Sequence, residues 1–199
     1  MLILPSLLAA PLSDIKSVIT KLKISAVHFD VMDGIFVPEI SFGSFLARDL
    51  QKNVPDLKLD VHLMVANPSS QVDNFLINNC FRITFHYENN VHHLRLAAKI
   101  RATGKKVGIA INPETPVSMI KDIICYFDSV LVMSVCPGYS GQQFLNFSKE
   151  KVKELIRLRE RENLIFSICV DGGVDDQIAQ ELSSLKVDEV VMGKAFFSK

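Results

Sequence analysis

The segment Leu2-Ile3-Leu4-Pro5-Ser6-Leu7-Leu8-Ala9-Ala10-Pro11 decides between two folds that the chain could adopt. It reads as a short apolar strand followed by a strand-to-helix turn without glycine. An open, doubly wound α/β sheet would carry its glycine-rich dinucleotide loop at this first turn. The missing glycines therefore favour the other α/β arrangement, a closed barrel. We expect no signal peptide, because no Lys or Arg precedes the apolar residues and Pro5 interrupts them.

Working outward from this segment, short apolar, β-rich runs recur along the whole chain. The predicted strands are Leu2–Pro5, Ala26–Val31, Leu57–Met64, Arg82–His86, Lys106–Ile111, Ser129–Ser134, Ile165–Asp171 and Glu189–Gly193. Stretches with helical spacing of apolar residues separate them, as in 12–22, 72–76, 91–100 and 152–158. Alternating strands and helices imply parallel pairing through crossovers, and eight such units fit a single (β/α)8 TIM barrel.

The barrel should occupy residues 1–199 as one domain, because no linker or change in composition divides the chain. Only Ala195-Phe196-Phe197-Ser198-Lys199 follows the eighth predicted strand. We therefore expect the final helix to be short or missing, and the outer groove to be open or covered by a neighbouring subunit.

Composition excludes several classes of function. The 22 Lys and Arg residues balance the 22 Asp and Glu residues, and no basic stretch interleaved with aromatic residues is present, so nucleic-acid binding is disfavoured. No apolar run approaches the ~18 residues of a membrane span. The four cysteines form no CxxC pair and lie among apolar residues, which predicts buried free thiols and a reducing, cytoplasmic setting.

Four polar residues stand out within the apolar runs. If His28 and Asp30 on the second strand, His62 on the third and Asp171 on the seventh all face inward, the barrel mouth brings them together. Two imidazoles and two carboxylates suit a divalent metal such as zinc, iron, cobalt or manganese. Each residue alone could be a loop cap or a member of an ion pair. The joint arrangement favours a metal site, because buried charges need a partner.

Asp30 and Asp171 lie on strands that face each other roughly across the mouth. Two carboxylates on opposite sides of one substrate carbon are what a two-base proton transfer needs. The alternative for Asp171 is a simple turn former, because Asp-Gly-Gly is also typical of turns.

Glycines cluster after the last three predicted strands, and this fold commonly binds phosphate at the loops after the seventh and eighth strands. They lie in Gly138-Tyr139-Ser140-Gly141, in Gly172-Gly173 and at Gly193. Lys194 either adds a positive charge at this site or faces solvent. Met32, Met64 and Met133 either form apolar walls over the substrate or simply fill the core.

Six motifs together resemble the ribulose-phosphate 3-epimerase family, the pentulose-5-phosphate 3-epimerases. In chain order they are Pro5–Leu8, His28-Phe29-Asp30-Val31-Met32-Asp33-Gly34-Ile35-Phe36-Val37-Pro38, Asp60-Val61-His62-Leu63-Met64-Val65, Asn112–Pro116, Val132–Gly138 with Gly141-Gln142, and Val170-Asp171-Gly172-Gly173-Val174. They keep the family's order and cover essentially the whole chain to Gly193.

The resemblance implies a barrel of the ribulose-phosphate-binding type and an isomerase of carbohydrate metabolism, placed in the pentose phosphate pathway. Such an enzyme interconverts D-ribulose 5-phosphate and D-xylulose 5-phosphate at carbon 3 through a cis-enediolate. His28, Asp30, His62 and Asp171 would hold one divalent metal, zinc in the first place, and Asp30 and Asp171 would be the acid/base pair. The implied substrate contacts are Ser6, His62, Met32, Met64, Met133, Gly138, Tyr139, Ser140, Gly141, Gly172, Gly173, Gly193 and Lys194. A homo-oligomer without nucleic-acid or membrane partners is expected.

The chain departs from the family's usual pattern at the proposed phosphate site. Gly138-Tyr139-Ser140-Gly141 stands where the family usually has Gly-Phe-Gly-Gly, and Gly193-Lys194 where it usually has Gly-Ser. Two alternatives therefore stay open: a 3-epimerase of another ketose phosphate, such as allulose 6-phosphate, and a metal- or sugar-phosphate-binding barrel without catalysis.

Overall fold

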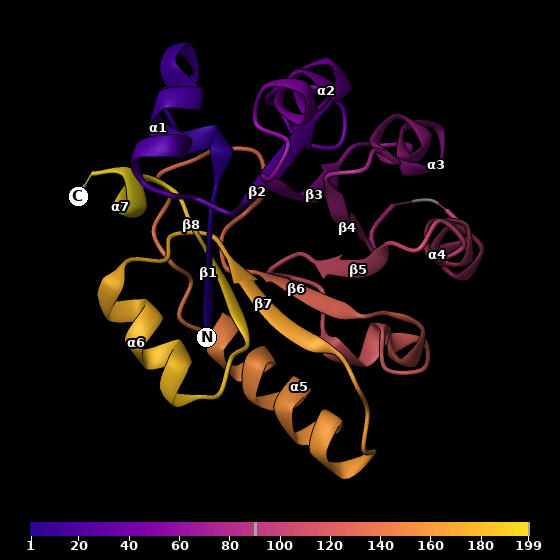
Figure 1. The fold of residues 1–199 in the computed structure, drawn as a ribbon. Helices are drawn as coiled ribbons and strands as arrows, with labels where there is room; N and C mark the ends of the chain where they lie inside the picture. Colours follow the sequence, from indigo (N-terminus) through magenta and orange to yellow (C-terminus); the bar gives the residue numbers. More distant parts are fainter. Residues whose placement is uncertain (90, 199) are drawn as a thin grey trace.

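Eight parallel strands, in the order β1-β8-β7-β6-β5-β4-β3-β2, form one nearly closed barrel in the computed structural model, which describes residues 1–89 and 91–198 (Figure 1). The strands are β1 (Leu2–Pro5), β2 (Ala26–Met32), β3 (Lys58–Met64), β4 (Cys80–His86), β5 (Lys106–Ile111), β6 (Ser129–Met133), β7 (Ser167–Asp171) and β8 (Glu189–Met192). A single parallel bridge, Ser6 to His28, closes the barrel between β1 and β2. The predicted (β/α)8 architecture is confirmed.

The predicted strands all form, and their ends differ from the prediction by at most two residues. Ile165 illustrates the difference, because its apolar side chain extends the strand pattern but is 95 % exposed and precedes β7. The α-helices on the outside of the barrel are α1 (Ile15–Lys21), α2 (Ser44–Asn53), α3 (Pro68–Gln71), α4 (His93–Arg101), α5 (Ser148–Arg161), α6 (Asp176–Ser184) and α7 (Lys194–Phe197).

At two places the apolar spacing predicts a helix where the structure has 3-10 turns. Residues 72–76 form no α-helix of their own: α3 ends at Gln71, and a 3-10 turn, Val72–Phe75, follows. Between β5 and β6, the chain makes only the 3-10 turns Val117–Met119 and Ile124–Tyr126. Their apolar residues still pack on the strands, because Ile120 and Ile124 are fully buried. Burial of apolar side chains therefore covers this part of the barrel without a regular helix.

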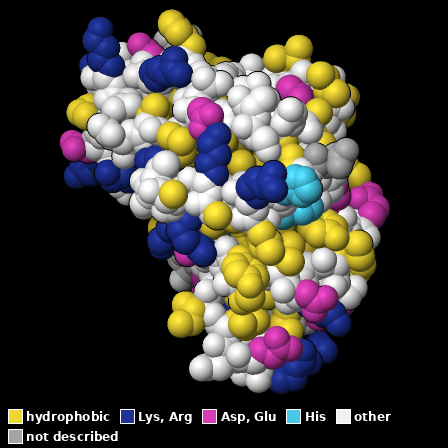
Figure 2. Space-filling model, turned by 90° about the vertical axis from the view of Figure 1, so that its right-hand side faces the viewer, with side chains coloured by type: hydrophobic (Ala, Val, Ile, Leu, Met, Phe, Trp, Pro, Cys, Tyr) yellow, Lys and Arg dark blue, Asp and Glu magenta, His cyan; other side chains and the backbone are white. Residues whose placement is uncertain are grey.

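A groove lined mostly by apolar side chains lies between α4 and the 3-10 turn Ile124–Tyr126. Its lining residues are Leu94, Ala97, Ala98, Arg101, Ala102 and Tyr126. Figure 2 views the side of the barrel that carries α3 and α4 and shows apolar side chains gathered there. At the C-terminus, α7 is a single turn of four residues, as the short C-terminal segment predicts, and Lys199 lies outside the described residues.

Two layers of side chains make up the core. Odd-numbered residues of β2 and β3, such as Phe29 and Val61, point outward and are buried beneath the helices. A smaller cluster fills the barrel interior and consists of Ala110, Leu131, Met133, Cys169 and Val191. Each apolar side chain moved from water into such a core contributes about 1.5–3 kcal/mol to folding. The inward positions not used by this cluster are free to carry polar side chains.

The prediction of buried thiols is only half right. Cys80 and Cys169 are buried free thiols, whereas Cys125 and Cys136 are exposed free thiols. Cys125 lies in a 3-10 turn on the outside of the barrel, and Cys136 follows β6 at the mouth, so neither is covered by a helix. Within residues 1–89 and 91–198, no helix has both the length and the apolar character needed to cross a membrane.

Candidate active site and metal centre

The register between β2 and β3 stacks their inward side chains into layers. His28 pairs with Asp60, Asp30 with His62, and Met32 with Met64. The lower layer therefore holds an imidazole beside a carboxylate, and the next layer holds a carboxylate beside an imidazole. Asp171 ends β7 and enters the same space at the C-terminal mouth, where barrel enzymes carry their active sites.

Four donor atoms from His28, Asp30, His62 and Asp171 lie within 4.8 Å of one another. His28 Nε2 is 3.1 Å from Asp30 Oδ1, 3.3 Å from His62 Nδ1 and 3.6 Å from Asp171 Oδ2. His62 Nδ1 is 3.1 Å from Asp30 Oδ1 and 3.8 Å from Asp171 Oδ2. Metal–donor bonds of about 2.0–2.1 Å in a tetrahedron give donor–donor edges of about 3.3–3.4 Å. The predicted ligand set therefore converges with spacings that fit one divalent ion.

The second nitrogen of His28 is held by a buried ionic network inside the barrel. His28 Nδ1 is 2.9 Å from Asp60 Oδ2. Arg82 on β4 donates from Nε and one terminal nitrogen to Asp60, at 2.6 and 2.8 Å, and donates to Glu189 on β8 at 2.6 Å. A carboxylate behind a metal-binding histidine fixes the tautomer and orientation of the ring. Asp60 therefore leaves Nε2 of His28 pointing at the metal centre.

The second nitrogen of His62 meets another imidazole. His62 Nε2 is 2.9 Å from His86 Nε2, and His86 Nδ1 is 3.2 Å from Glu88 Oε2. Burial lowers the pKa of His86 to about 4, although Glu88 opposes the shift. His86 is therefore a neutral imidazole between His62 and Glu88 near pH 7.

The two carboxylates at the centre have opposite pKa shifts. Burial raises the pKa of Asp171 to about 7, and the nearby Asp30 carboxylate adds to the shift while His28 opposes it. Burial also acts to raise the pKa of Asp30, but the charge and hydrogen bond of His28 outweigh it and hold that pKa well below its usual range. Burial likewise acts against charge on His28, yet Asp30 and Asp60 raise the pKa of His28 well above its ordinary value. Asp30 is thus ionised where Asp171 can carry a proton.

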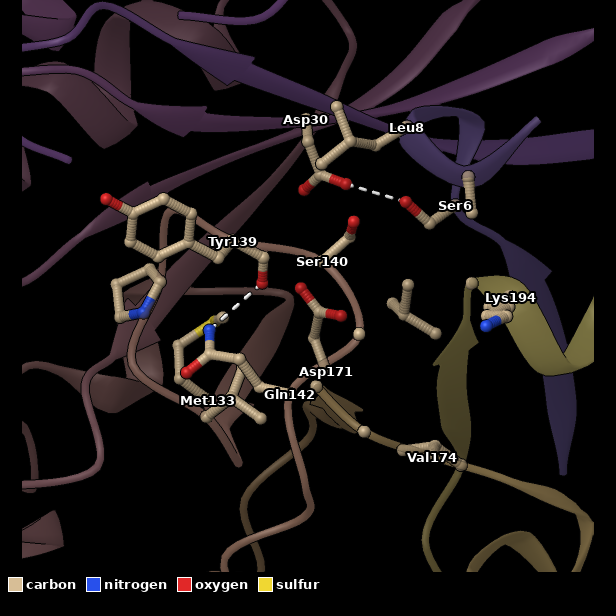
Figure 3. Close-up of a pocket in the computed structure, with 18 of the residues that line it drawn as sticks. Ser6, Leu8, Asp30, Met133, Tyr139, Ser140, Gln142, Asp171, Val174 and Lys194 are labelled. Atoms are coloured by element: carbon tan, nitrogen blue, oxygen red, sulfur yellow. Dashed lines mark hydrogen bonds between the residues drawn. The ribbon is translucent and has the colours of Figure 1, made fainter. Parts of the chain in front are cut away.

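A cavity of about 420 Å³ opens above this cluster at the mouth of the barrel. Figure 3 shows Asp30 and Asp171 presenting their carboxylates to it from opposite walls, with the Ser6 hydroxyl donating to Asp30 Oδ2 at 2.9 Å. Of the predicted substrate contacts, all but His62 line this cavity: Ser6, Met32, Met64, Met133, Gly138, Tyr139, Ser140, Gly141, Gly172, Gly173, Gly193 and Lys194. His28 and His62 are fully buried next to the carboxylates.

The glycines of the β7 loop allow two loops to approach closely. Gly172 has φ +120°, and a Cβ there would lie 2.4 Å from Val135 Cγ2. Gly173 has φ +64°, and a Cβ there would lie 2.5 Å from the Phe144 backbone nitrogen. Any larger residue would push the loop after β6 away from the loop after β7. Gln142 stiffens the β6 loop by donating to the carbonyls of Cys136 and Tyr139, at 2.6 and 3.0 Å.

Lys194 lies at the end of the cavity away from Met133 (Figure 3). It begins α7 directly after Gly193, lines the cavity and is exposed to solvent. The cavity is therefore lined by methionines, by the glycines after β6, β7 and β8, and by Lys194 on the side away from Met133. An elongated substrate with an anionic terminus would match this distribution.

Sequence reasoning missed the residues behind the metal ligands. Asp60 shares the inward parity of His62, but no role was assigned to it, and Arg82, His86 and Glu88 were not considered as site residues. The alternation of inward and outward side chains along a strand could have identified them. Arg82, Thr84 and His86 occupy every second position of β4, as His28 and Asp30 do on β2. The pairing of Arg82 with Glu189 had no such signal, because 107 residues separate the two in sequence.

Comparison with known proteins gives one consistent result. The model of the ribulose-phosphate 3 epimerase family matches residues 2–197. Ribulose-phosphate 3-epimerase of Treponema pallidum is 40 % identical over 197 residues, which cover 98 % of this chain and 90 % of that protein. The Aquifex aeolicus enzyme of the same name is 38 % identical over 171 residues, with coverages of 86 % and 77 %. The chloroplastic ribulose-5-phosphate-3-epimerase of Arabidopsis thaliana is 34 % identical, with coverages of 98 % and 70 %.

Similarity to solved structures extends to more distant barrels. The structure of 3-hexulose-6-phosphate synthase from Salmonella typhimurium aligns with a TM-score of 0.69 at 14 % identity, covering 100 % of this chain and 92 % of that chain. Phosphoribosyl anthranilate isomerase from Thermus thermophilus aligns with a TM-score of 0.67 at 14 % identity, covering 98 % and 88 %. At these identities the likeness concerns the fold alone.

Proposed function

The chain belongs to the ribulose-phosphate 3-epimerase family, whose members are isomerases that act on carbohydrates, and from this premise we propose that it interconverts D-ribulose 5-phosphate and D-xylulose 5-phosphate. The observation that carries the proposal is the pair Asp30 and Asp171, whose carboxylates face one cavity from opposite walls. An epimerisation at a carbon next to a ketone needs one base and one acid on opposite faces of that carbon.

In this mechanism Asp30, as a carboxylate, takes the proton from carbon 3. The electron pair of the broken C–H bond moves toward the ketone oxygen and gives a cis-enediolate. Protonated Asp171 then returns a proton to carbon 3 from the opposite face, which completes the inversion. In the reverse direction the two residues exchange roles. Ser6 holds the Asp30 carboxylate in place through its hydrogen bond.

The donor set His28, Asp30, His62 and Asp171 would hold a divalent ion beside the reacting atoms. Such an ion, when bound, stabilises the negative charge that develops on the substrate oxygens. We propose zinc, because two imidazoles and two carboxylates are donors that suit it, with iron, manganese and cobalt as the ions to test against it.

The remaining predicted contacts divide between the two ends of the cavity. Met32, Met64 and Met133 form the apolar wall over the carbon chain, and we propose that it excludes water from the enediolate. The glycines after β6, β7 and β8 offer backbone N–H groups to the phosphate, and Lys194 adds a positive charge. Because Tyr139, Ser140 and Lys194 depart from the usual pattern at this end, a six-carbon ketose phosphate is the second candidate substrate.

Two further properties of the protein are its compartment and its assembly. We propose a reducing, cytoplasmic compartment, because all four cysteines are free thiols. We propose a homo-oligomer with no nucleic-acid or membrane partner, as the family resemblance implies; the balance of 22 Lys and Arg against 22 Asp and Glu also disfavours nucleic acid. Size-exclusion chromatography with light scattering tests the oligomeric state.

The decisive experiment incubates the zinc-loaded protein with D-ribulose 5-phosphate in D₂O and follows carbon 3 by NMR. Formation of D-xylulose 5-phosphate with deuterium at carbon 3 supports proton transfer through an exchangeable enzyme group. A folded, metal-loaded sample that gives neither product nor exchange refutes the proposal. Allulose 6-phosphate is then the next substrate, and inactivity there as well would indicate a barrel that binds without catalysis.

A further inference from the structure

We propose that His86 and Glu88 are positioning residues that fix the tautomer of His62, so that Nδ1 of His62 carries the lone pair for the metal. The inference rests on the metal centre of the proposed function and deepens it. Neither His86 nor Glu88 lines the cavity or offers an atom to the cluster of four donors. Both act only through His62.

The Glu88 carboxylate determines which atoms donate and which accept in the hydrogen bonds from Glu88 through His86 to His62. Glu88 Oε1 accepts from the Asn112 backbone N–H at 2.8 Å and from the Thr115 hydroxyl. An ionised carboxylate offers only acceptors, so Oε2 must also accept. The group 3.2 Å from Oε2 is His86 Nδ1, which therefore carries the proton of that ring.

The tautomer of His62 follows from that of His86 by the same argument. A neutral imidazole with its proton on Nδ1 has a lone pair on Nε2. His86 Nε2 is 2.9 Å from His62 Nε2, so His62 must donate this bond and keep its proton on Nε2. Nδ1 of His62 then carries the lone pair: it can accept from His28 Nε2 at 3.3 Å, and it lies 3.1 Å from Asp30 Oδ1, where a divalent ion between the two acceptors would satisfy both. The opposite tautomer of either ring would place two N–H groups or two lone pairs against each other.

His86 is held rigidly enough to serve this purpose. Its side chain is fully buried, and the Phe36 ring lies against it with centroids 4.8 Å apart. The backbone N–H of His86 donates to Asn89 Oδ1 at 3.1 Å, and Asn89 in turn donates to the carbonyl of Val65 at 2.8 Å. The end of β4 is thus tied to the end of β3, which carries His62. The His86 side chain is fully buried, so water does not compete with it as the partner of His62, whereas the Glu88 side chain is 21 % exposed.

The test measures zinc affinity by competition with a chromophoric chelator, together with the thermal stability of the metal-free protein. His86→Leu removes the acceptor, and we expect its zinc affinity to fall about 10- to 100-fold. His86→Gln restores an amide oxygen that can accept from His62, so most of the affinity should return. His93→Leu is the matched control: His93 loses a comparable hydrogen bond, to the Tyr87 carbonyl at 2.7 Å, but does not contact the centre. Its zinc affinity should equal that of the wild type.

A second measurement does not depend on any variant. Long-range ¹H–¹⁵N NMR spectra of the zinc-loaded wild-type protein, labelled at histidine, report which ring nitrogen carries each proton. We expect the proton of His62 on Nε2 and that of His86 on Nδ1. A proton on His86 Nε2, or a His86→Leu variant that binds zinc as the wild type does, would overturn the inference.

Neither readout uses turnover, so the outcomes can be separated. A wild-type protein that binds zinc with the expected tautomers but epimerises no substrate refutes the proposed reaction and supports the positioning role. A folded wild-type protein that binds no zinc overturns the metal centre and the positioning role together.

Discussion

Replacing Arg82 by Met should destabilise the fold by about 3–5 kcal/mol, because it strips the counter-ion from a buried carboxylate. The Arg82 side chain is 3 % exposed and that of Asp60 is 1 % exposed. Arg82 donates twice to Asp60 and once to Glu189, at 2.6–2.8 Å. Met keeps most of the volume of the Arg stem, so the loss measures the charge and the hydrogen bonds rather than a cavity.

The size of this destabilisation follows from the carboxylates that Arg82→Met leaves without their cation. Without Arg82, the Asp60 carboxylate keeps, among the described residues, the His28 imidazole as its hydrogen-bond partner, while Glu189, at 16 % exposure, can be partly solvated. Breaking a buried ion pair from one side costs about 3–5 kcal/mol, a large part of the total stability of about 5–15 kcal/mol of a typical domain. Asp60→Asn combined with Arg82→Met removes the orphaned charge, so the double variant should regain about 0.5–3 kcal/mol.

Urea unfolding at pH 7 in the presence of EDTA measures this change without a metal contribution. The chain has no Trp, so far-UV circular dichroism is the main probe, and coincidence with tyrosine fluorescence checks the two-state analysis. Arg101→Met is the matched control, because the Arg101–Asp128 pair is 48 % and 36 % exposed and should be worth at most about 1 kcal/mol. A loss below about 1 kcal/mol for Arg82→Met, at an unchanged denaturant slope, would refute the argument from buried charge.

Three further predictions concern the site. Asp171→Asn should fold and keep much of its zinc binding but lose about 10²–10⁴-fold in kcat, and near wild-type turnover would exclude the two-base role. Lys194→Ser should raise KM for the phosphorylated substrate with kcat little changed and weaken the ionic-strength dependence of kcat/KM; an unchanged KM would mean that Lys194 faces solvent. Hydrogen bonds from His86, Thr115 and Asn112 outweigh burial and lower the pKa of Glu88 to about 2. Because the folded-state pKa lies below the unfolded value, this stabilisation is complete above about pH 4.5 and is lost as the pH falls toward 2. After a discount for the partial exposure of Glu88, the free energy of unfolding in urea should fall by about 2 kcal/mol more across this pH range in the wild type than in Glu88→Gln. An equal fall in both proteins would contradict the lowered pKa of Glu88.

Much of the barrel and of the metal centre could be predicted from the sequence, because both depend on strand parity. A strand places alternate residues on opposite faces, so His28 and Asp30 had to share a face once Phe29 pointed toward the helices. Parallel alternation of strands and helices then brought the ends of β2, β3 and β7 to the same mouth. The family motifs supplied the roles of these residues, which parity alone does not. The extent of the domain, residues 1–199, stays a prediction.

The helices were less predictable than the strands. Apolar spacing predicts that a segment covers the barrel, and residues 117–126 do cover it, but as 3-10 turns. Ile120 and Ile124 are buried equally well by either geometry, so the pattern does not distinguish them. The two exposed cysteines show the same limit, because apolar neighbours in sequence do not imply cover in space.

Local periodicity and residue type are enough to predict which residues face inward and which loops contain the glycines of the proposed phosphate site. The partners behind each metal ligand become visible only in the folded barrel. Arg82 meets Glu189 across the barrel, and His86 meets His62 because neighbouring strands align in one register. The shifts of Asp30 and Asp171 in opposite directions also arise only in the folded chain, since burial and charge act through space and not along the sequence.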